Sequence, residues 1–283
     1  MTDVDAAEGE VRAAVSLLRD WIFAADVSFT DQRERLESVT GAGVLGPGVT
    51  SAETRVGGVA CTALTSEDVV ADRSIVYAHG GGYCIGSPSM GLALGSFLAR
   101  ALRATWYGVH YRLAPEHVAP AAVDDVAAVA SALGGVVVGV GDSAGGGALV
   151  AAARRGAPLR ALVLISPWLD LAPDPARDEV HDPLLSIPWM EACARAYSVD
   201  VADPEVSPLG GDWSVLGPVL VVSAGQDLTA PDVARLMSHA PLNVACLDEP
   251  TLWHDYALLV GAIPAADAAA SRMAEHLAGA TGW

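Results

Sequence analysis

Two glycine-bearing segments of this chain could together perform acyl chemistry. The segment Gly141-Asp142-Ser143-Ala144-Gly145 has the Gly-x-Ser-x-Gly form in which a serine is held on a sharp turn. The segment His79-Gly80-Gly81-Gly82 lies about sixty residues upstream. A serine hydroxyl is a weak nucleophile at its free pKa, so it needs a base, and the attacked carbonyl needs donors for its developing negative charge. The two segments therefore predict a serine nucleophile and an oxyanion hole.

The expected oxyanion donors are the backbone N–H groups of Gly81, Gly82 and Ala144. Consecutive glycines let N–H groups turn toward a substrate without clashes from a Cβ atom. We interpret His79 as a structural residue that ties this loop down, and Asp142 as a structural carboxylate. The alternatives are a flexible glycine hinge and a chance serine motif in a chain with 29 glycines. Both are disfavoured because each segment directly follows an apolar strand pattern.

The acid that orients the base is expected downstream of Ser143, in the order Ser, Asp, His. Asp227 comes just after the apolar run 219–223, so it would stand at the carboxyl end of a core strand, where a carboxylate can be buried against an imidazole. Asp232 follows Pro231 in the next helical turn, and we interpret it as an N-terminal helix cap. The sequence therefore favours Asp227 as the acid.

Three histidines follow Asp227 and compete for the role of the base. His276 lies within the closing helical pattern, and His239 ends a helix, where the helix dipole favours an imidazolium. His254 lies in a loop flanked by aromatic residues that could exclude water. We therefore expect His254 to be the base that activates Ser143.

Strand and helix patterns alternate from residue 74 to the end of the chain. Apolar strand candidates lie at 74–79, 105–111, 136–140, 161–165 and 219–223, with a weaker one at 244–247. Helical spacing occurs at 90–102, 121–133, 146–155 and 264–277. Strands bounded by glycine and alternating with helices are typical of a mostly parallel sheet with helices on both faces. We expect one α/β domain over residues 1–283.

Two regions outside this pattern are expected to form a small helical cap, about 1–45 and 172–216. Residues 8–40 have helical spacing, and the glycine-rich stretch 41–48 reads as a linker. Insertions such as 172–216, which holds one helix candidate at 188–197, usually lie over the carboxyl ends of the strands, where ligands bind. The substrate-pocket candidates are Tyr83, Trp189 and Trp213, together with Trp21 and Phe23 on the first helix, whereas Trp168 reads as a core residue.

The composition narrows the expected partners. The chain has no lysine and a formal net charge of −18, which argues against nucleic acid or an anionic membrane as a partner. No apolar run reaches the ~20 residues of a membrane span, and the first residues lack the features of a secretory signal. The four cysteines are far apart in the sequence, and no spacing suggests a metal site. We expect a cytoplasmic protein that acts on a small molecule without a metal or cofactor.

Beyond these motifs, the chain resembles the hormone-sensitive-lipase family of esterases, the bacterial family IV branch of the α/β-hydrolases. The resemblance rests on segments that occur in family order: His79–Tyr83, Tyr111–His117 with Pro120–Asp125, Gly141–Gly146, Ser166–Asp170, Asp227 and His254. It implies an α/β-hydrolase fold and a carboxylic ester hydrolase that works through an acyl-enzyme. It also implies a monomer or homodimer, and an oxyanion loop braced by Arg112, Glu116 and Asp124 or Asp125.

The chain departs from the family pattern at two places. The segment from Asp227 to Asp232 differs from the family's usual arrangement, in which a second carboxylate soon follows Asp-x-Leu. The segment His254-Asp255-Tyr256 stands where the family often has His-Gly-Phe. Both changes leave the expected catalytic triad of Ser143, Asp227 and His254 in place but alter the residues that surround it.

The reaction outcome stays open at this point. We expect short-chain or compact esters rather than long triglycerides. The alternatives are an amidase or deacetylase, or a lyase or acyltransferase, acting on a small natural product with the same triad. A receptor without catalytic activity is a further alternative, although such proteins typically lose the base.

Overall fold

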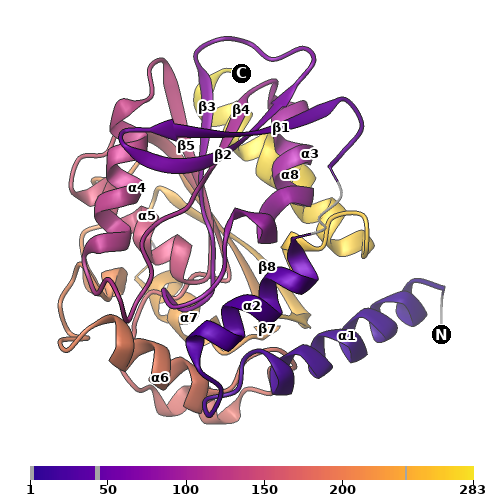
Figure 1. The fold of residues 1–283 in the computed structure, drawn as a ribbon, viewed down its shortest axis with the longest axis vertical. Helices are drawn as coiled ribbons and strands as arrows, with labels where there is room; N and C mark the ends of the chain where they lie inside the picture. The colour runs from indigo at the N-terminus through magenta and orange to yellow at the C-terminus, as the bar shows by residue number, and fades with distance from the viewer. Residues whose placement is uncertain (1–2, 42–44, 240) are drawn as a thin grey trace.

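An eight-stranded sheet crosses the middle of the computed structural model, which describes residues 3–41, 45–239 and 241–283 (Figure 1). The strands are β1 (Val49–Val56), β2 (Val59–Ser66), β3 (Arg73–Ala78), β4 (Thr105–Val109), β5 (Val136–Asp142), β6 (Leu159–Ile165), β7 (Val219–Gln226) and β8 (Val244–Trp253). Their order is β1-β2-β4-β3-β5-β6-β7-β8. The pairs β1–β2 and β2–β4 are antiparallel, and all the other pairs are parallel.

Helices cover both faces of this sheet. They are α1 (Asp3–Trp21), α2 (Phe29–Thr40), α3 (Leu92–Leu102), α4 (Ala121–Ala132), α5 (Ala144–Arg154), α6 (Ile187–Tyr197), α7 (Ala230–Ser238) and α8 (Pro264–Thr281). Short 3₁₀ turns occur at Pro88–Gly91, Pro175–Glu179, Pro208–Gly210 and Tyr256–Leu258. One buried apolar cluster lies under α3 and α8, and a second lies under α4 and α5 on the other face (Figure 1). The expected α/β-hydrolase architecture is therefore confirmed.

The strands of the parallel part follow from their sequences. Runs of β-branched residues such as Val136-Val137-Val138 have no polar face, and both of their faces are covered by helices. The six predicted strands are all present, although β4 ends at Val109 and β8 continues to Trp253. This longer β8 delivers the next residue, His254, to the carboxyl end of the sheet.

The antiparallel hairpin of β1 and β2 was not predicted. Its turn is Gly57-Gly58, with φ angles of 59° and 82°, in the left-handed region that glycine adopts without strain. A Gly-Gly pair between two runs rich in threonine and valine is a hairpin signal, so the sequence carried the necessary information. The hairpin extends the sheet beyond β4 and lies far from the serine turn.

The helices α1, α2 and α6 gather at one end of the molecule, at the bottom of the view in Figure 1. The predicted helical stretch at 8–40 is two helices, and Phe23 lies beyond the end of α1 rather than on it. Within the expected linker at 41–48, residues 42–44 lie outside the described part of the chain. Among the described helices, none combines the length and the apolar character that a membrane span requires.

Asp232 is not the helix cap that its sequence position suggested. Thr229 is the N-cap residue of α7, and the Asp232 side chain is fully buried within the first turn. Its carboxylate accepts the backbone N–H groups of Leu169 at 3.0 Å and Asp170 at 2.9 Å, and it pairs with the buried guanidinium of Arg177 at 2.9 Å. This carboxylate therefore fastens the insertion that follows β6 to α7.

We expect Asp232→Ala to lower the free energy of unfolding by about 3–5 kcal/mol, because it leaves the charge of Arg177 buried without its partner. Urea unfolding followed by circular dichroism measures this change. Glu275→Ala, which removes a carboxylate from an exposed pair with Arg272, is the control and should cost at most ~1 kcal/mol. Equal effects of the two substitutions would contradict an anchoring role for Asp232.

Candidate active site

Ser143 lies on a sharp turn between β5 and α5, in the strand–turn–helix setting that its motif predicts. Its φ of 50° is in the left-handed region that favours glycine, so the backbone is strained at this residue. The N–H of Ser143 donates to the carbonyl of Ile165 at 2.8 Å, and its carbonyl accepts from Trp168 at 3.0 Å. A Cβ atom on Gly145 would lie 2.0 Å from the carbonyl oxygen of Ala78, so only glycine fits there.

The oxyanion loop follows β3 and contains two glycines with positive φ, Gly81 at 104° and Gly82 at 61°. A Cβ atom on Gly81 would lie 2.2 Å from the carbonyl oxygen of Ile85. Among the described residues, no acceptor takes the N–H of either glycine. Ala144 begins α5, and the first N–H groups of a helix have no partner within it. The N–H groups of all three residues are therefore free to donate hydrogen bonds to an oxyanion.

The predicted base and acid meet at the carboxyl ends of β7 and β8. Nδ1 of His254 lies 2.8 Å from Oδ1 of Asp227, and both side chains are buried. The same carboxylate oxygen accepts the N–H and the hydroxyl of Thr229 at 2.7 and 2.8 Å. Ser143 and His254 line one cavity, but no hydrogen bond joins their side chains in the described part of the chain. Such contacts are often long before substrate binds.

The charges around His254 shift its pKa. Burial lowers the pKa of His254, but the negative charges of Asp227 and Asp255 outweigh burial, so the pKa lies well above its usual range. Burial raises the pKa of Asp227, yet the charge of His254 and hydrogen bonds from His254, Ser166 and Thr229 bring it below its usual value. Asp227 is therefore ionised, and His254 binds a proton readily.

Sequence reasoning did not find Asp182 as part of this site. Its carboxylate accepts the N–H groups of Leu184 at 2.8 Å, Leu185 at 3.2 Å and Leu228 at 3.1 Å, which fastens the insertion beside Asp227. Burial and the charge of Asp227 raise its pKa to about 6. A loop aspartate 45 residues before its neighbour carries no local pattern that could reveal this contact.

Sequence reasoning also did not assign a role to Asp255. Its φ of 58° lies in the left-handed region, and its N–H donates to the hydroxyl of Ser166 at 3.0 Å. Its Oδ2 atom lies 3.1 Å from Nε2 of His254. The sequence shows an aspartate where the family often has glycine. The position of its side chain, however, depends on the φ angle of Asp255, which the sequence does not show.

Asp142, next to the nucleophile, holds the oxyanion loop in place. It accepts the hydroxyl of Tyr77 at 2.6 Å and the N–H of Gly80 at 2.7 Å. Burial, followed by the negative charge of Asp255, raises its pKa well above the usual range. Asp142 therefore connects the turn that carries the serine to the loop that carries the donors.

His79 lies behind the oxyanion loop. Nδ1 lies 2.7 Å from the carbonyl oxygen of Gly80, and the ring stacks on Tyr111 with the centroids 4.1 Å apart. The hydroxyl of Tyr111 donates to the carbonyl of His79 at 2.7 Å. Burial lowers the pKa of His79 to about 3, so the ring is neutral. These contacts are those of a residue that supports the loop.

The residues that the resemblance assigned to bracing the loop fall into three separate pairs. Arg112 pairs with Asp125 at 2.9 Å. Glu116 pairs with Arg33 of α2 at 2.8 Å, and not with Arg112. Asp124 pairs instead with Arg155 at the C-terminal end of α5, at 2.6 Å. Arg112 and Asp125 therefore pair within the segment 112–125, and a contact to the backbone beside the loop comes from Arg33 of α2.

Arg33 was not predicted, and it holds the oxyanion loop more directly than Glu116 does. Its guanidinium donates to the carbonyl of Cys84 at 2.8 Å and to the carbonyl of Ala114 at 2.7 Å. Both carbonyls belong to segments beside the loop. Arg33 and Cys84 are 51 residues apart in the sequence, so the helical pattern of α2 could not reveal their contact.

A cavity of about 160 Å³ opens onto Ser143, His254, Asp255 and Gly81. Its other walls are mostly apolar. They come from α1 and the residues after it, α2, the turn at Pro88–Gly91, the segment before α6, α6 itself, the end of β8 and the segment after His254: Val15, Leu18, Phe23, Leu36, Val39, Thr40, Met90, Leu184, Leu185, Trp189, Trp253, Leu258 and Leu259. The cavity is small for a ligand site, since sites for drug-sized molecules span roughly 300–1,000 Å³. It fits a compact substrate.

Of the predicted pocket residues, only Trp189 and Phe23 line this cavity. Tyr83 is buried behind the loop, where its ring stacks on Tyr197 with the centroids 3.8 Å apart. Trp213 packs against Arg154 at the end of α5, away from the serine. Both aromatic side chains are buried because they fill the core. The prediction for Trp168 as a buried core residue agrees with the structure.

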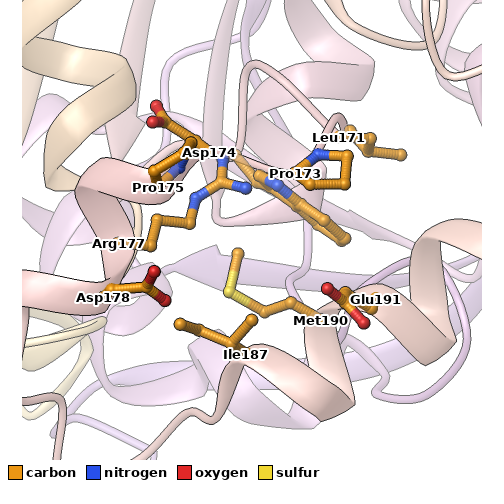
Figure 2. A pocket seen from close by; sticks show the side chains of 10 residues that line it. Leu171, Pro173, Asp174, Pro175, Arg177, Asp178, Ile187, Met190 and Glu191 are labelled. Atoms are coloured by element: carbon orange, nitrogen blue, oxygen red, sulfur yellow. The ribbon is translucent and has the colours of Figure 1, made fainter.

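A second cavity, of about 190 Å³, lies between the insertion and α6, and it contains none of the triad candidates (Figure 2). Its floor includes Met190 and Ile187, and its rim carries the carboxylates of Asp174, Asp178 and Glu191. Arg177, also in its wall, already pairs with Asp232.

Asp182, Asp227 and His254 are the group of described residues whose ligand atoms lie close enough to hold a metal ion, all within 4.8 Å. Nδ1 of His254 already contacts Asp227, and the Asp182 carboxylate accepts three backbone N–H groups. The donor atoms are thus used in a hydrogen-bond network that orients the imidazole.

Comparison with known proteins places this chain among hydrolases. Residues 75–258 match a family described as alpha/beta hydrolase fold. An acetyl-hydrolase of Streptomyces hygroscopicus is 37% identical over 186 residues, which cover 60% of this chain and 62% of that protein, less than two thirds of its length. The carboxylesterase NlhH of Mycobacterium tuberculosis is 32% identical over 229 residues, which cover 70% of each chain.

Solved structures agree with this match. A hormone-sensitive lipase from a metagenome library superposes with a TM-score of 0.84 at 27% identity, covering 95% of this chain and 98% of the other. The likeness therefore extends over nearly the whole chain, whereas the family match covers residues 75–258.

We expect the labelling of Ser143 by a fluorophosphonate to become faster as the pH rises, with a midpoint above 6.5. Only neutral His254 can accept the serine proton, and a raised pKa means that the neutral form is lost as the pH falls through that value. The rate constant for labelling, measured from about pH 5 to about pH 9, tests this. Circular dichroism at each pH checks that the fold is intact. A midpoint below 6.5 would contradict the charge arrangement around His254.

Proposed function

This chain belongs to the alpha/beta hydrolase fold family, in its hormone-sensitive-lipase-like branch, and we propose that it hydrolyses compact carboxylic esters through Ser143, His254 and Asp227. The observation that carries the proposal is the contact of 2.8 Å between His254 and Asp227, beside a cavity that also exposes Ser143. The acetyl-hydrolase and carboxylesterase relatives support the same reaction class.

The reaction begins when His254 takes the hydroxyl proton of Ser143 and the oxygen attacks the ester carbonyl. Asp227 keeps the proton of Nδ1 in place and stabilises the imidazolium that forms. His254 then gives its Nε2 proton to the leaving alkoxide. Water, deprotonated by the same nitrogen, attacks the acyl-enzyme and releases the acid. One base thus serves both halves of the reaction.

The negative charge on the carbonyl oxygen is bound by the N–H groups of Gly81, Gly82 and Ala144. The first two are held in place by the positive φ angles of their loop, and the third stands at the N-terminus of α5. Such donors act where charge develops, and losing one costs about 3–4 kcal/mol of transition-state stabilisation. The positive end of the α5 dipole adds to this effect.

The size of the substrate follows from the walls of the cavity. We assign the role of a small cap to the N-terminal helices and to the insertion around α6, because Leu18, Leu36 and Trp189 line the same cavity as Ser143. A cavity of about 160 Å³ leaves room for a short acyl chain and a compact alcohol. The protein acts as a monomer or homodimer.

An amidase or deacetylase reaction uses the same groups and remains the second candidate. Amide cleavage needs a proton delivered to a much more basic leaving nitrogen, and the raised pKa of His254 favours a protonated imidazole. A lyase, an acyl transfer or a receptor has no specific support among the contacts described above.

We expect hydrolysis of p-nitrophenyl acetate and butyrate, and a kcat/KM for p-nitrophenyl decanoate at least about tenfold lower, because the long chain exceeds the cavity. Release of p-nitrophenol measures the rates, and p-nitroacetanilide tests the amidase alternative. Ser143→Ala should lower kcat by about 10⁶-fold. A folded wild-type protein that is inactive on every ester would refute the proposal.

We expect His254→Ala to abolish both ester hydrolysis and fluorophosphonate labelling, because Ser143 then has no base. His239→Ala is the matched control, since His239 also follows Asp227 in the chain, is exposed and lies at the end of α7. It should leave kcat/KM within about twofold of the wild type, as expected of surface substitutions. Loss of activity in His239→Ala alone would overturn the assignment of the base.

A further inference from the structure

Asp255 is held in a conformation that suits glycine better than aspartate. Its φ is 58°, a region that costs a non-glycine residue free energy and that persists only where the surroundings enforce it. The hydrogen bond from its N–H to Ser166 and the complete burial of the following Tyr256 enforce it here. Such a residue at the edge of a reaction site is a reason to look for a role of the side chain.

This backbone conformation places the carboxylate of Asp255 next to the imidazole of His254. Oδ2 lies 3.1 Å from Nε2 of His254, the nitrogen that must accept the proton of Ser143. The other ring nitrogen is already bound to Asp227 at 2.8 Å. Because the side chains of His254 and Asp255 are both about nine-tenths buried or more, water screens this contact poorly.

We propose that Asp255 is a second acidic partner of His254, which competes with Ser143 for Nε2 and thereby sets the lowest pH at which the serine can be activated. The inference rests on the proposed function of Ser143 and His254. It makes Asp255 a positioning residue, because it acts through the imidazole. An imidazole between two carboxylates holds a proton on each nitrogen, and in that state it has no lone pair for the serine.

The proton changes can be followed atom by atom. In the resting state Nδ1–H faces Asp227 and Nε2–H faces Asp255. Raising the pH removes the Nε2 proton to solvent, after which the carboxylate and the free lone pair repel each other. Nε2 can then accept the hydroxyl proton of Ser143 as the serine oxygen attacks. Nothing else is consumed, so the step needs no co-reactant.

Two further carboxylates face the same imidazole from other elements. Asp142 stands at the end of β5, and burial, followed by the negative charge of Asp255, raises its pKa. Asp182, from the insertion, lies beside Asp227. No arginine forms an ion pair with Asp142, Asp182, Asp227 or Asp255 among the described residues. Among the residues that the structure describes, no arginine therefore balances the negative charge around His254.

The test compares Asp255→Asn and Asp255→Gly with the wild-type protein. Asparagine keeps the size of the side chain and tolerates positive φ, and glycine removes the side chain and relaxes the backbone, so both variants should fold. Thermal unfolding checks this. The readouts are the pH profile of kcat/KM for p-nitrophenyl acetate and the pH profile of the fluorophosphonate labelling rate of Ser143.

We expect the acid limb of both profiles to move to lower pH by about one unit or more in both variants, as the loss of a close negative charge predicts. On that limb one unit is about a tenfold gain in rate at a fixed pH. Rates on the alkaline plateau should change much less. Glu275→Gln, which removes one exposed carboxylate on α8, is the charge-matched control and should leave the profile in place.

Two results would overturn the inference. One is an acid limb that stays where the wild-type limb lies in both folded variants. The other is a loss of rate at every pH without a shift, which would show that Asp255 only supports the structure. The labelling profile does not depend on turnover, so a wild-type protein that is labelled but hydrolyses no ester refutes the proposed function and still tests Asp255.

Discussion

The close approach of α5 to the end of β3 is the constraint on which the site depends. At Gly145 there is no space for a Cβ atom, because the carbonyl oxygen of Ala78 would lie 2.0 Å away. At Gly80 a Cβ atom would lie 2.3 Å from the carboxylate of Asp142. The nucleophile turn and the oxyanion loop are therefore packed directly on each other's backbone. Their relative position is set by main-chain contact, which leaves little freedom for either to move alone.

The second constraint is the small number of positive charges available to pair with the many carboxylates. The chain has no lysine, so arginine is its only basic side chain apart from histidine. Three arginines serve as anchors within the structure: Arg33 holds two carbonyls beside the oxyanion loop, Arg112 grips Asp125, and Arg177 is buried against Asp232. A planar guanidinium that is always charged suits such multiple contacts. In the described part of the chain, the carboxylates around His254 receive no such partner, so their proton affinities depend on one another and on the imidazole.

The sequence carried most of the fold and the residues of the expected triad. Ser143, Asp227 and His254 could be chosen because a parallel sheet brings the carboxyl ends of its strands together, so local pattern and chain order were enough. The partners of Glu116 and Asp124 could not be chosen, because Arg33 and Arg155 approach them from helices distant in sequence. Tyr83 and Trp213 were assigned to the pocket because they are aromatic, yet the side toward which an aromatic ring packs is decided by the core. Asp255 was visible as a departure from the family pattern, but only its positive φ shows that it returns to His254.

The helices that line the cavity also contact the oxyanion loop. The same contacts therefore affect both the choice of substrate and the position of the oxyanion donors. Trp189 on α6 donates its indole N–H to Gln32 on α2 at 2.8 Å, and a Cβ atom on Gly82 would collide with Cys193 of α6 at 2.7 Å. Arg33, next to Gln32, reaches the backbone beside the same loop. A substitution that shifts α6 to admit a larger substrate must therefore also disturb the N–H groups of the loop. Leu36 also lines the cavity and is not among the atoms nearest a Cβ on Gly81 or Gly82, so a change there alters the size of the substrate site with less effect on the loop than a change on α6.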